Sequence, residues 1–206
     1  PVEAFLGVLL SLLLLAAPGR AAGIHQAQGE MAGEVTASSV LLQSRLTSLT
    51  GPALDEAGDV PGAAGVARFE WSESADFAKA RRTGWMMARA EGDFIVRATL
   101  DGWKPATRYY YRRVAGADQS SAKTGPTRQF KTLPAADSSA PVSFCMGSCM
   151  NYHPFMSGKA NGGGPVTATD EDKRLGYPAF AAMAKLAPDF FIGAGDIVYY
   201  DKGQPF

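Results

Sequence analysis

The chain of 206 residues is long enough for one well-packed core or for two small ones. Its 20 basic and 20 acidic residues cancel and are scattered along the sequence, so we expect neither a nucleic-acid-binding surface nor a polybasic membrane contact. With 2 cysteines, the chain does not belong to the class of small folds held together by disulfides.

The N-terminus contains a hydrophobic run, LGVLLSLLLLAA (residues 6–17), of the length found in signal peptides. Pro18 and Gly19 end this run, and small residues suited to cleavage follow. We therefore predict a signal peptide with a truncated start over residues 1–23, export to the periplasm or the extracellular space, and no stable membrane anchor. A retained hydrophobic anchor is the alternative. Because the chain starts without a methionine and stops at Phe206, directly after a motif described below, we expect a fragment of a longer protein.

Residues 34–134 contain short segments in which hydrophobic and polar residues alternate. The alternation is clearest at 94–101, and it predicts further strands at 38–48, 66–71, 108–114 and 127–132. Glycine, proline and aspartate separate these segments. This spacing is typical of a small antiparallel β-sandwich.

The segment WKPATRYYY (residues 103–111) resembles the tyrosine corner of fibronectin type III domains. In such a corner a tyrosine hydroxyl bonds to the backbone upstream of it. We therefore expect Tyr109 and Tyr111 to lie in the core, with Tyr110 and Arg112 facing outward. The alternative is a binding surface made of the three tyrosines.

A linker and a second domain are predicted after the sandwich. Residues 135–141 are small and polar, as an interdomain linker should be. They are followed by a buried strand at 142–147, a helix at 178–187 that Pro188 stops, and a second buried strand at 190–192. The order strand, helix, strand predicts a βαβ unit with parallel strands, at the start of an α/β domain over residues 142–206.

Two predicted strands are each followed by a residue that can bind a metal. Cys149 follows the first strand and Asp196 the second, and the carboxyl ends of parallel strands lie at the same edge of a sheet. Tyr199 can return its phenol oxygen to the same point. Thiolate and phenolate suit a high-charge ion such as ferric iron, and a carboxylate can bridge to a second, harder cation. The structural alternatives are an inert cysteine and a glycine turn with a capping aspartate.

The other cysteine and one histidine lie near these residues. We expect Cys145 to belong to the core and to form no disulfide with Cys149, because an extended chain separates their Cα atoms by about 13 Å. His153 follows Cys149 by four residues, where it could be a metal ligand, a substrate contact or a surface residue.

The segments Ser148-Cys149, DFFI (189–192) and GDIVY (195–199) resemble the PhoD-like alkaline phosphatases of the metallophosphoesterase superfamily. Earlier segments resemble the N-terminal β-domain of that family, namely 34–36, 38–45, 93–100, 104–112 and 130–134. This resemblance implies an exported phosphoesterase that hydrolyses phosphate mono- or diesters through a metal-activated hydroxide. The implied cofactors are iron and calcium, or a related divalent metal pair.

The resemblance also implies roles for single residues. Cys149 corresponds to the metal-binding cysteine of the family, and Asp196 to its catalytic, metal-bridging aspartate. Tyr199 corresponds to the tyrosine of the Asp-x-x-Tyr pattern that purple acid phosphatases use as an iron ligand. We assign Asn151 and His153 to substrate binding.

Two further functions remain open from the sequence alone. The chain could be an exported adhesion or carbohydrate-binding module built on the β-sandwich, or a metalloenzyme other than a phosphatase. Bound iron would separate the first of these from a phosphoesterase. We also expect the chain by itself to be inactive, because a two-metal site needs more ligands than Cys149, Asp196 and Tyr199.

Overall fold

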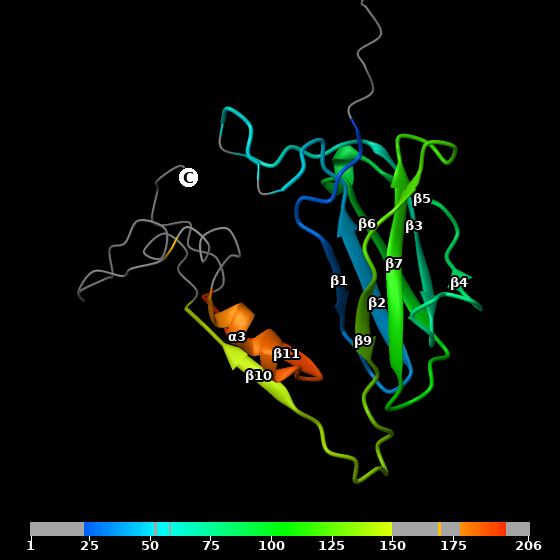
Figure 1. The fold of residues 1–206 in the computed structure, drawn as a ribbon, viewed down its shortest axis with the longest axis vertical. Coiled ribbons are helices and arrows are strands. Elements are labelled where there is room, and N and C mark those ends of the chain that lie inside the picture. The colour runs from blue at the N-terminus through cyan, green and yellow to red at the C-terminus, as the bar shows by residue number, and fades with distance from the viewer. Residues whose placement is uncertain (1–22, 52, 58, 150–168, 170–177, 197–206) are drawn as a thin grey trace, which may run out of the picture.

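The structure is a computed structural model that describes residues 23–51, 53–57, 59–149, 169 and 178–196. Figure 1 shows two parts, a sandwich of β-sheets and a small unit of two strands and one helix beside it. Residues 1–22 of the predicted signal peptide lie outside the described residues, as do Asn151, His153 and Tyr199. In the described part of the chain, no helix has the length and hydrophobicity needed to cross a membrane.

The sandwich consists of two antiparallel sheets. One sheet has the order β1-β2-β6, formed by Glu30–Gly33, Ser39–Arg45 and Ile95–Asp101. The other has the order β4-β3-β7-β8, formed by Arg81–Arg82, Gly65–Ser72, Arg108–Gly116 and Lys123–Thr124; β5 (Met86–Ala88) also pairs with β3, and β9 (Arg128–Lys131) with β7. A short 3-10 helix, η1 (Ala90–Gly92), precedes β6.

Each strand predicted from the alternation in residues 34–134 is present, so the predicted antiparallel sandwich is confirmed. The sheets also start earlier than we predicted. Strand β1 precedes residue 34, and His25 forms an isolated β-bridge with Thr47. The sequence of β1 is EMAG, which is too short and has too many small residues to show an alternating pattern.

The inward-facing residues of both sheets form one core. Figure 1 shows the sheets face to face, and the core between them contains Val40, Leu42, Leu46, Phe69, Trp71, Val96, Trp103, Tyr109, Tyr111 and Phe130. Trp103 is the centre of its aromatic part, with ring centroids 4.4 Å from Tyr109 and 5.2 Å from Phe130. Because such edge-to-face contacts add to the burial of apolar area, this aromatic group is a large part of what holds the sheets together.

The predicted tyrosine corner is confirmed. The hydroxyl of Tyr109 accepts a hydrogen bond of 3.0 Å from the backbone N–H of Lys104. The buried hydroxyl of Thr132 donates to the Lys104 carbonyl oxygen at 2.6 Å, so both backbone groups of Lys104 are paired. Tyr109 and Tyr111 are buried as expected, whereas Tyr110 is only partly buried.

A buried carboxylate connects the two sheets at the β1 edge. The side chain of Glu30 on β1 has no exposed surface, and it forms ion pairs with Arg128 at 3.3 Å and Arg113 at 3.9 Å. Both arginines belong to strands of the opposite sheet. Since an unpaired buried charge is costly, these pairs make β1 part of the sandwich rather than a loose N-terminal segment.

The second part of the structure contains β10 (Phe144–Gly147), α3 (Pro178–Leu186) and β11 (Phe190–Gly193). The strands pair in parallel, with Phe144 opposite Phe190 and Gly147 opposite Gly193. Helix α3 ends at Leu186, one residue before the predicted end, because Ala187 turns into the left-handed region (φ 48°) and Pro188 follows.

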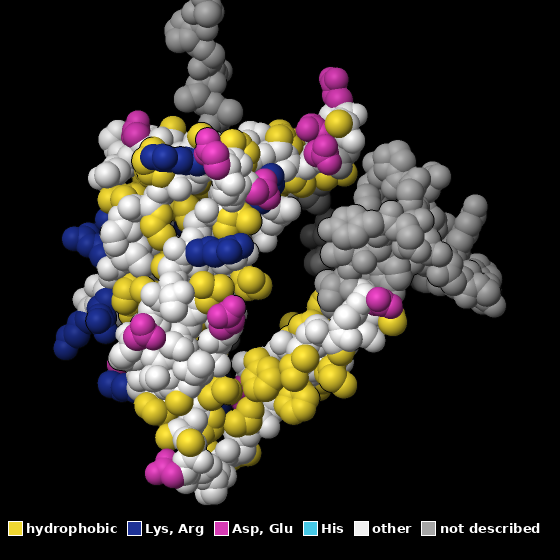
Figure 2. Space-filling model, turned by 180° about the vertical axis from the view of Figure 1, so that it is seen from behind, with side chains coloured by type: hydrophobic (Ala, Val, Ile, Leu, Met, Phe, Trp, Pro, Cys, Tyr) yellow, Lys and Arg dark blue, Asp and Glu magenta, His cyan; other side chains and the backbone are white. Residues whose placement is uncertain are grey.

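Helix α3 packs against one face of this strand pair. The rings of Phe180 on the helix and Phe191 on β11 lie 5.8 Å apart. The opposite face contains Phe144, Met146 and Ile192, whose exposed fractions are 55%, 62% and 38%. Figure 2 shows hydrophobic side chains gathered on the surface of this unit. Phe191, on the face toward α3, is itself 39% exposed, so α3 covers that face only in part and leaves the other face open.

Candidate functional site

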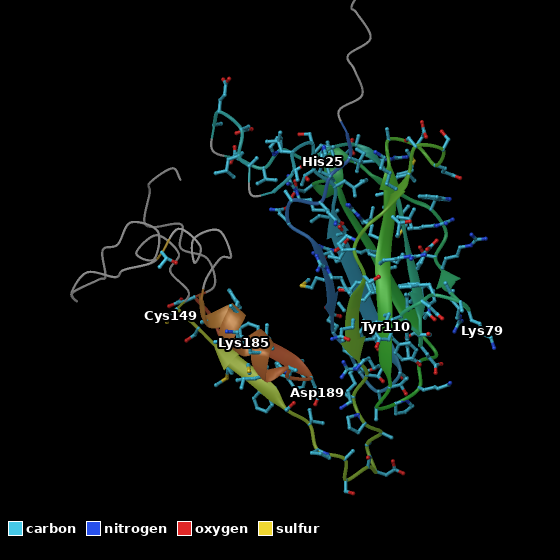
Figure 3. All side chains as sticks on the ribbon, viewed as in Figure 1. His25, Lys79, Tyr110, Cys149, Lys185 and Asp189 are labelled. Atoms are coloured by element: carbon cyan, nitrogen blue, oxygen red, sulfur yellow. The ribbon has the colours of Figure 1, made fainter. Side chains whose placement is uncertain are left out.

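The candidate site lies where the two parallel strands end. Their register carries on past the strands, because Ala194 N–H donates to the Gly147 carbonyl at 2.9 Å and Cys149 N–H donates to the Gly195 carbonyl at 3.3 Å. These bonds hold the two following turns side by side. As Figure 3 shows, Cys149 lies at one end of the unit and Asp189 at the other.

The structure brings Cys149 and Asp196 into contact. The Cys149 thiol donates to Asp196 Oδ2 across 3.5 Å, although 47 residues separate the two in sequence. Both side chains belong to exposed residues, open to a metal ion or a substrate. The contact follows from the parallel pairing that the strand-helix-strand order predicts.

Both residues have a left-handed backbone conformation, which is unusual for a cysteine and more common for an aspartate. Cys149 has a φ of 57° and Asp196 a φ of 49°, in the left-handed region, next to Gly195 with a φ of 106°. A residue with a Cβ atom costs about 1 kcal/mol or more in that region. Six other described residues that are not glycine also have a positive φ, so this conformation does not by itself mark the site.

The two donors fit part of the predicted metal site. A thiolate and a carboxylate at this spacing can share a cation, and they are of the types that we predicted for iron and a second, harder ion. Within the described residues, however, no group of three or more His, Cys, Asp and Glu side chains gathers to hold a metal. Tyr199, Asn151 and His153 lie outside the described residues, so their roles stay predictions.

Cys145 is separate from this pair. Both cysteines are free thiols, which agrees with the expectation that they form no disulfide. Cys145 is partly buried within β10 and lies opposite Phe191, on the face that α3 covers. It therefore belongs to the packing of the unit, while Cys149 lies at its exposed end.

Asp189 is a residue that sequence reasoning missed. Its Oδ1 accepts from Lys131 Nζ at 2.9 Å, and its Oδ2 accepts from the N–H of Ser143 at 2.9 Å. The bond from Ser143, followed by the charge and hydrogen bond of Lys131, holds the pKa of the Asp189 carboxyl below its usual range. The only local signal for Asp189 in the sequence was its position between Pro188 and a predicted strand. That signal does not reveal its partners, Lys131 and Ser143, which lie far away in the sequence.

A pocket on the sandwich does not resemble a carbohydrate-binding site. It has a volume of about 560 Å³ and contains Trp71 and Trp103, whose exposed fractions are only 8% and 6%. Sugar rings stack on exposed aromatic faces, and these faces are buried in the core. The acidic groups of the pocket are also occupied, because Glu73 pairs with Lys104 at 2.8 Å and Asp76 accepts from the N–H of Ala78 at 2.9 Å.

Comparison with known families decides which group of proteins the chain belongs to. The family model for the PhoD-like phosphatase N-terminal domain matches residues 16–134, more than half of the chain. The chain belongs to the PhoD-like phosphatase family. The resemblance seen in the sequence motifs is thus confirmed, and the sandwich is the part of the chain that carries most of the match.

A solved structure shares the fold of this chain. A structure of PhoD is 22% identical and has a TM-score of 0.51, covering 82% of this chain and 38% of that chain. This likeness shows a shared fold, and the present chain spans less than two fifths of the length of that PhoD structure. No curated protein sequence matches the chain.

Two other structures resemble the sandwich more loosely. A fibronectin type III domain from human KIAA0970 protein is 19% identical, covers 59% of this chain and 80% of that chain, and has a TM-score of 0.39. The sensor domain of the anti-sigma factor RsgI4 in Pseudobacteroides cellulosolvens is 16% identical, covers 50% of this chain and 89% of that chain, and has a TM-score of 0.36.

Proposed function

We propose that this chain is part of an exported, metal-dependent phosphoesterase that hydrolyses phosphate monoesters or diesters. Membership of the PhoD-like phosphatase family supports the reaction class. The single observation that carries the proposal to particular residues is the 3.5 Å contact between Cys149 Sγ and Asp196 Oδ2. The hydrophobic run in residues 6–17, which has the length of a signal peptide, supports export.

In this proposal the two parts of the chain have different roles. The sandwich, residues 34–134, is the N-terminal domain, and residues 135–141 form the linker. The β10-α3-β11 unit is the first βαβ unit of a metallophosphoesterase domain that starts at residue 142. The placement of both donors beyond the carboxyl ends of parallel strands supports this assignment, because ligands of open α/β sheets bind there.

Cys149, Asp196 and Tyr199 are the proposed metal-binding residues, with iron and calcium, or a related divalent pair, as the cofactors. When bound, such a metal pair would supply a hydroxide nucleophile and neutralise charge on the phosphate. Asp196 has two carboxylate oxygens and can face two ions at once, whereas Cys149 offers one soft sulfur donor. Asn151 and His153 are the proposed substrate contacts.

The first experiment tests metal binding by the chain itself. Purified chain is titrated with ferric iron, and the visible absorption from thiolate-to-iron charge transfer is recorded. We expect Cys149→Ser to abolish this band, because a hydroxyl replaces the thiolate. Cys145→Ser is the matched control and should leave the band unchanged. Equal iron binding in Cys149→Ser and the parent chain would show that Cys149 is not a ligand.

The second experiment tests the reaction on the complete phosphoesterase of which we propose this chain to be a part. The described residues provide two donors, fewer than a two-metal site needs, so turnover is not measured on the chain alone. The substrates are p-nitrophenyl phosphate and bis-p-nitrophenyl phosphate, with iron and calcium supplied. We expect turnover that Asp196→Asn reduces by at least about 100-fold. Full activity in that variant would contradict the proposed role of Asp196.

A further inference from the structure

Asp189 lies at the end of the β10-α3-β11 unit that is remote from the candidate site (Figure 3). It directly precedes β11, and its partner Ser143 directly precedes β10. Four bonds join the two residues. The Asp189 carboxylate oxygen Oδ2 accepts from Ser143 N–H at 2.9 Å and from Ser143 Oγ at 3.2 Å, and Asp189 N–H donates to the Ser143 carbonyl at 2.9 Å and to Ser143 Oγ at 3.3 Å. Asp189 and Ser143 are therefore locked together where the parallel pairing begins.

Besides these bonds, the register of the strand pair rests on the stacked rings of Phe144 and Phe190, 5.4 Å apart, and on the two bonds beyond the strands that join Ala194 to Gly147 and Cys149 to Gly195. The strand pair contains 4 residue pairs, from Phe144–Phe190 to Gly147–Gly193. One face of the strand pair is exposed to solvent. Burial of hydrophobic side chains can therefore favour the correct register only through the face that packs against α3. A slip of two residues keeps every side chain on its face but moves one strand by about 7 Å relative to the other. Such a slip would separate Cys149 from Asp196.

The sandwich keeps the Asp189 carboxylate in place. Lys131 on β9 forms an ion pair with Asp189 Oδ1 at 2.9 Å, and the Asp189 side chain is only 16% exposed. A cleft of about 260 Å³ lies beside this ion pair, between Arg108 and Gln129 of the sandwich and Ala184 and Ala187 near the end of α3. The two carboxylate oxygens thus have separate partners: Oδ1 bonds to the sandwich and Oδ2 bonds to β10.

We propose that Asp189 is the positioning residue of the candidate site: by binding the N–H of Ser143, it sets the register that places Cys149 against Asp196. A role of Asp189 in catalysis rests on the proposed function. Its role in setting the strand register does not depend on that function. Lys131 holds the carboxylate from the other side and is not needed for the register, because Oδ2 alone bonds to Ser143.

Disulfide trapping measures this register without metal or substrate. In a Cys145→Ser background, Asp196→Cys places a second thiol beside Cys149, and mild oxidation should join the two. Into this reference we introduce Asp189→Ala, Asp189→Asn or Lys131→Met. Trapping rates are compared by the loss of free thiols with time. Because no phosphatase activity enters the measurement, its result is independent of the outcome for the proposed function.

We expect Asp189→Ala to lower the trapping rate by about tenfold, since it removes a charge-assisted bond to Ser143. Asp189→Asn keeps an oxygen for the Ser143 N–H and should stay within about twofold of the reference, as should Lys131→Met. Unchanged trapping in Asp189→Ala would overturn the proposal. Losses of equal size in all three variants would also overturn it, because the ion pair between Asp189 and Lys131 of the sandwich would then set the register.

A second measurement separates positioning from general unfolding. Hydrogen exchange of the amides near the end of α3 reports whether the unit is still folded. We expect this protection to persist in Asp189→Ala while the Cys149 amide, which bonds to the Gly195 carbonyl at 3.3 Å, loses its protection. Loss of protection throughout α3 would assign Asp189 a role in stability alone and would overturn the proposal.

Discussion

The sandwich and the β10-α3-β11 unit differ in how completely they bury their hydrophobic side chains. Phe69 and Leu42 of the sandwich are completely buried between two sheets, whereas Phe144 and Met146 of the unit are more exposed than buried. The unit nevertheless holds both described residues of the candidate site. The candidate site therefore belongs to the unit, whose hydrophobic side chains are partly exposed, and not to the sandwich, which has a closed hydrophobic core.

Geometry explains this difference. Two facing sheets enclose their inner side chains from both directions, while a single strand pair with one helix has only one covered face. Two-stranded sheets are only marginally stable alone. The edge at which parallel strands end is, however, a place where separate segments bring polar groups together, and ligands of open α/β sheets bind there.

The largest expected effect comes from making the same deletion in both parts. Phe69→Ala should destabilise the sandwich by about 3–5 kcal/mol, because it leaves a cavity in a closed core. Phe144→Ala should change the free energy of unfolding of the sandwich by less than about 0.5 kcal/mol. Urea unfolding followed by tryptophan fluorescence measures both values. Similar losses in the two variants would mean that the parts unfold as one cooperative body.

A second prediction concerns the pH dependence of the sandwich. Burial, followed by the negative charge of Glu30, raises the pKa of Tyr111 from 10.0 to about 12. Between these values the unfolded chain has lost the phenol proton and the folded chain has kept it. Stability therefore falls as the pH rises from 10 to 12, by about 2–3 kcal/mol in all.

The test is to measure urea unfolding at several pH values in this range. Tyr111→Phe should remove this loss, and Tyr110→Phe, which changes an outward-facing ring, should retain it. If the parent chain and Tyr111→Phe lose stability in parallel above pH 10, the burial of the phenol is not the cause.

A third, smaller effect tests the tyrosine corner. Tyr109→Phe removes the hydroxyl that accepts from Lys104 N–H and should cost about 1–2 kcal/mol, because that partly buried donor loses its partner. Tyr110→Phe serves again as the control, with an expected change below about 0.5 kcal/mol. Thermal unfolding compares the two. A change in Tyr109→Phe no larger than that of the control would show that water replaces the lost acceptor.

The smallest effect on stability is expected on the open face of the unit. Met146→Lys should leave the unfolding of the sandwich unchanged, because the side chain is largely exposed. It should reduce the binding of a dye specific for exposed hydrophobic surface and the tendency of the chain to self-associate. Undiminished dye binding would show that the exposed hydrophobic surface that binds the dye lies elsewhere on the molecule.

Much of this molecule follows from local patterns in the sequence. Alternation at 66–71 and 94–101 predicts which side chains enter the core, and the spacing from Trp103 to Tyr109 predicts the corner. The order strand, helix, strand predicts that Cys149 and Asp196 reach the same sheet edge. These features depend on neighbours in the chain or on general rules of topology, and a single sequence contains that information.

Other features were decided only by the tertiary structure. Glu30 meets Arg128 across 98 residues, and Lys131 meets Asp189 across 58, and neither pair has a local signal. The left-handed backbone at Cys149, against the preference of a residue with a Cβ atom, likewise lies in a turn that is bonded to the turn at Gly195. Ion pairs and strained turns depend on how separate segments dock, and docking is settled by the whole fold rather than by any one stretch of sequence.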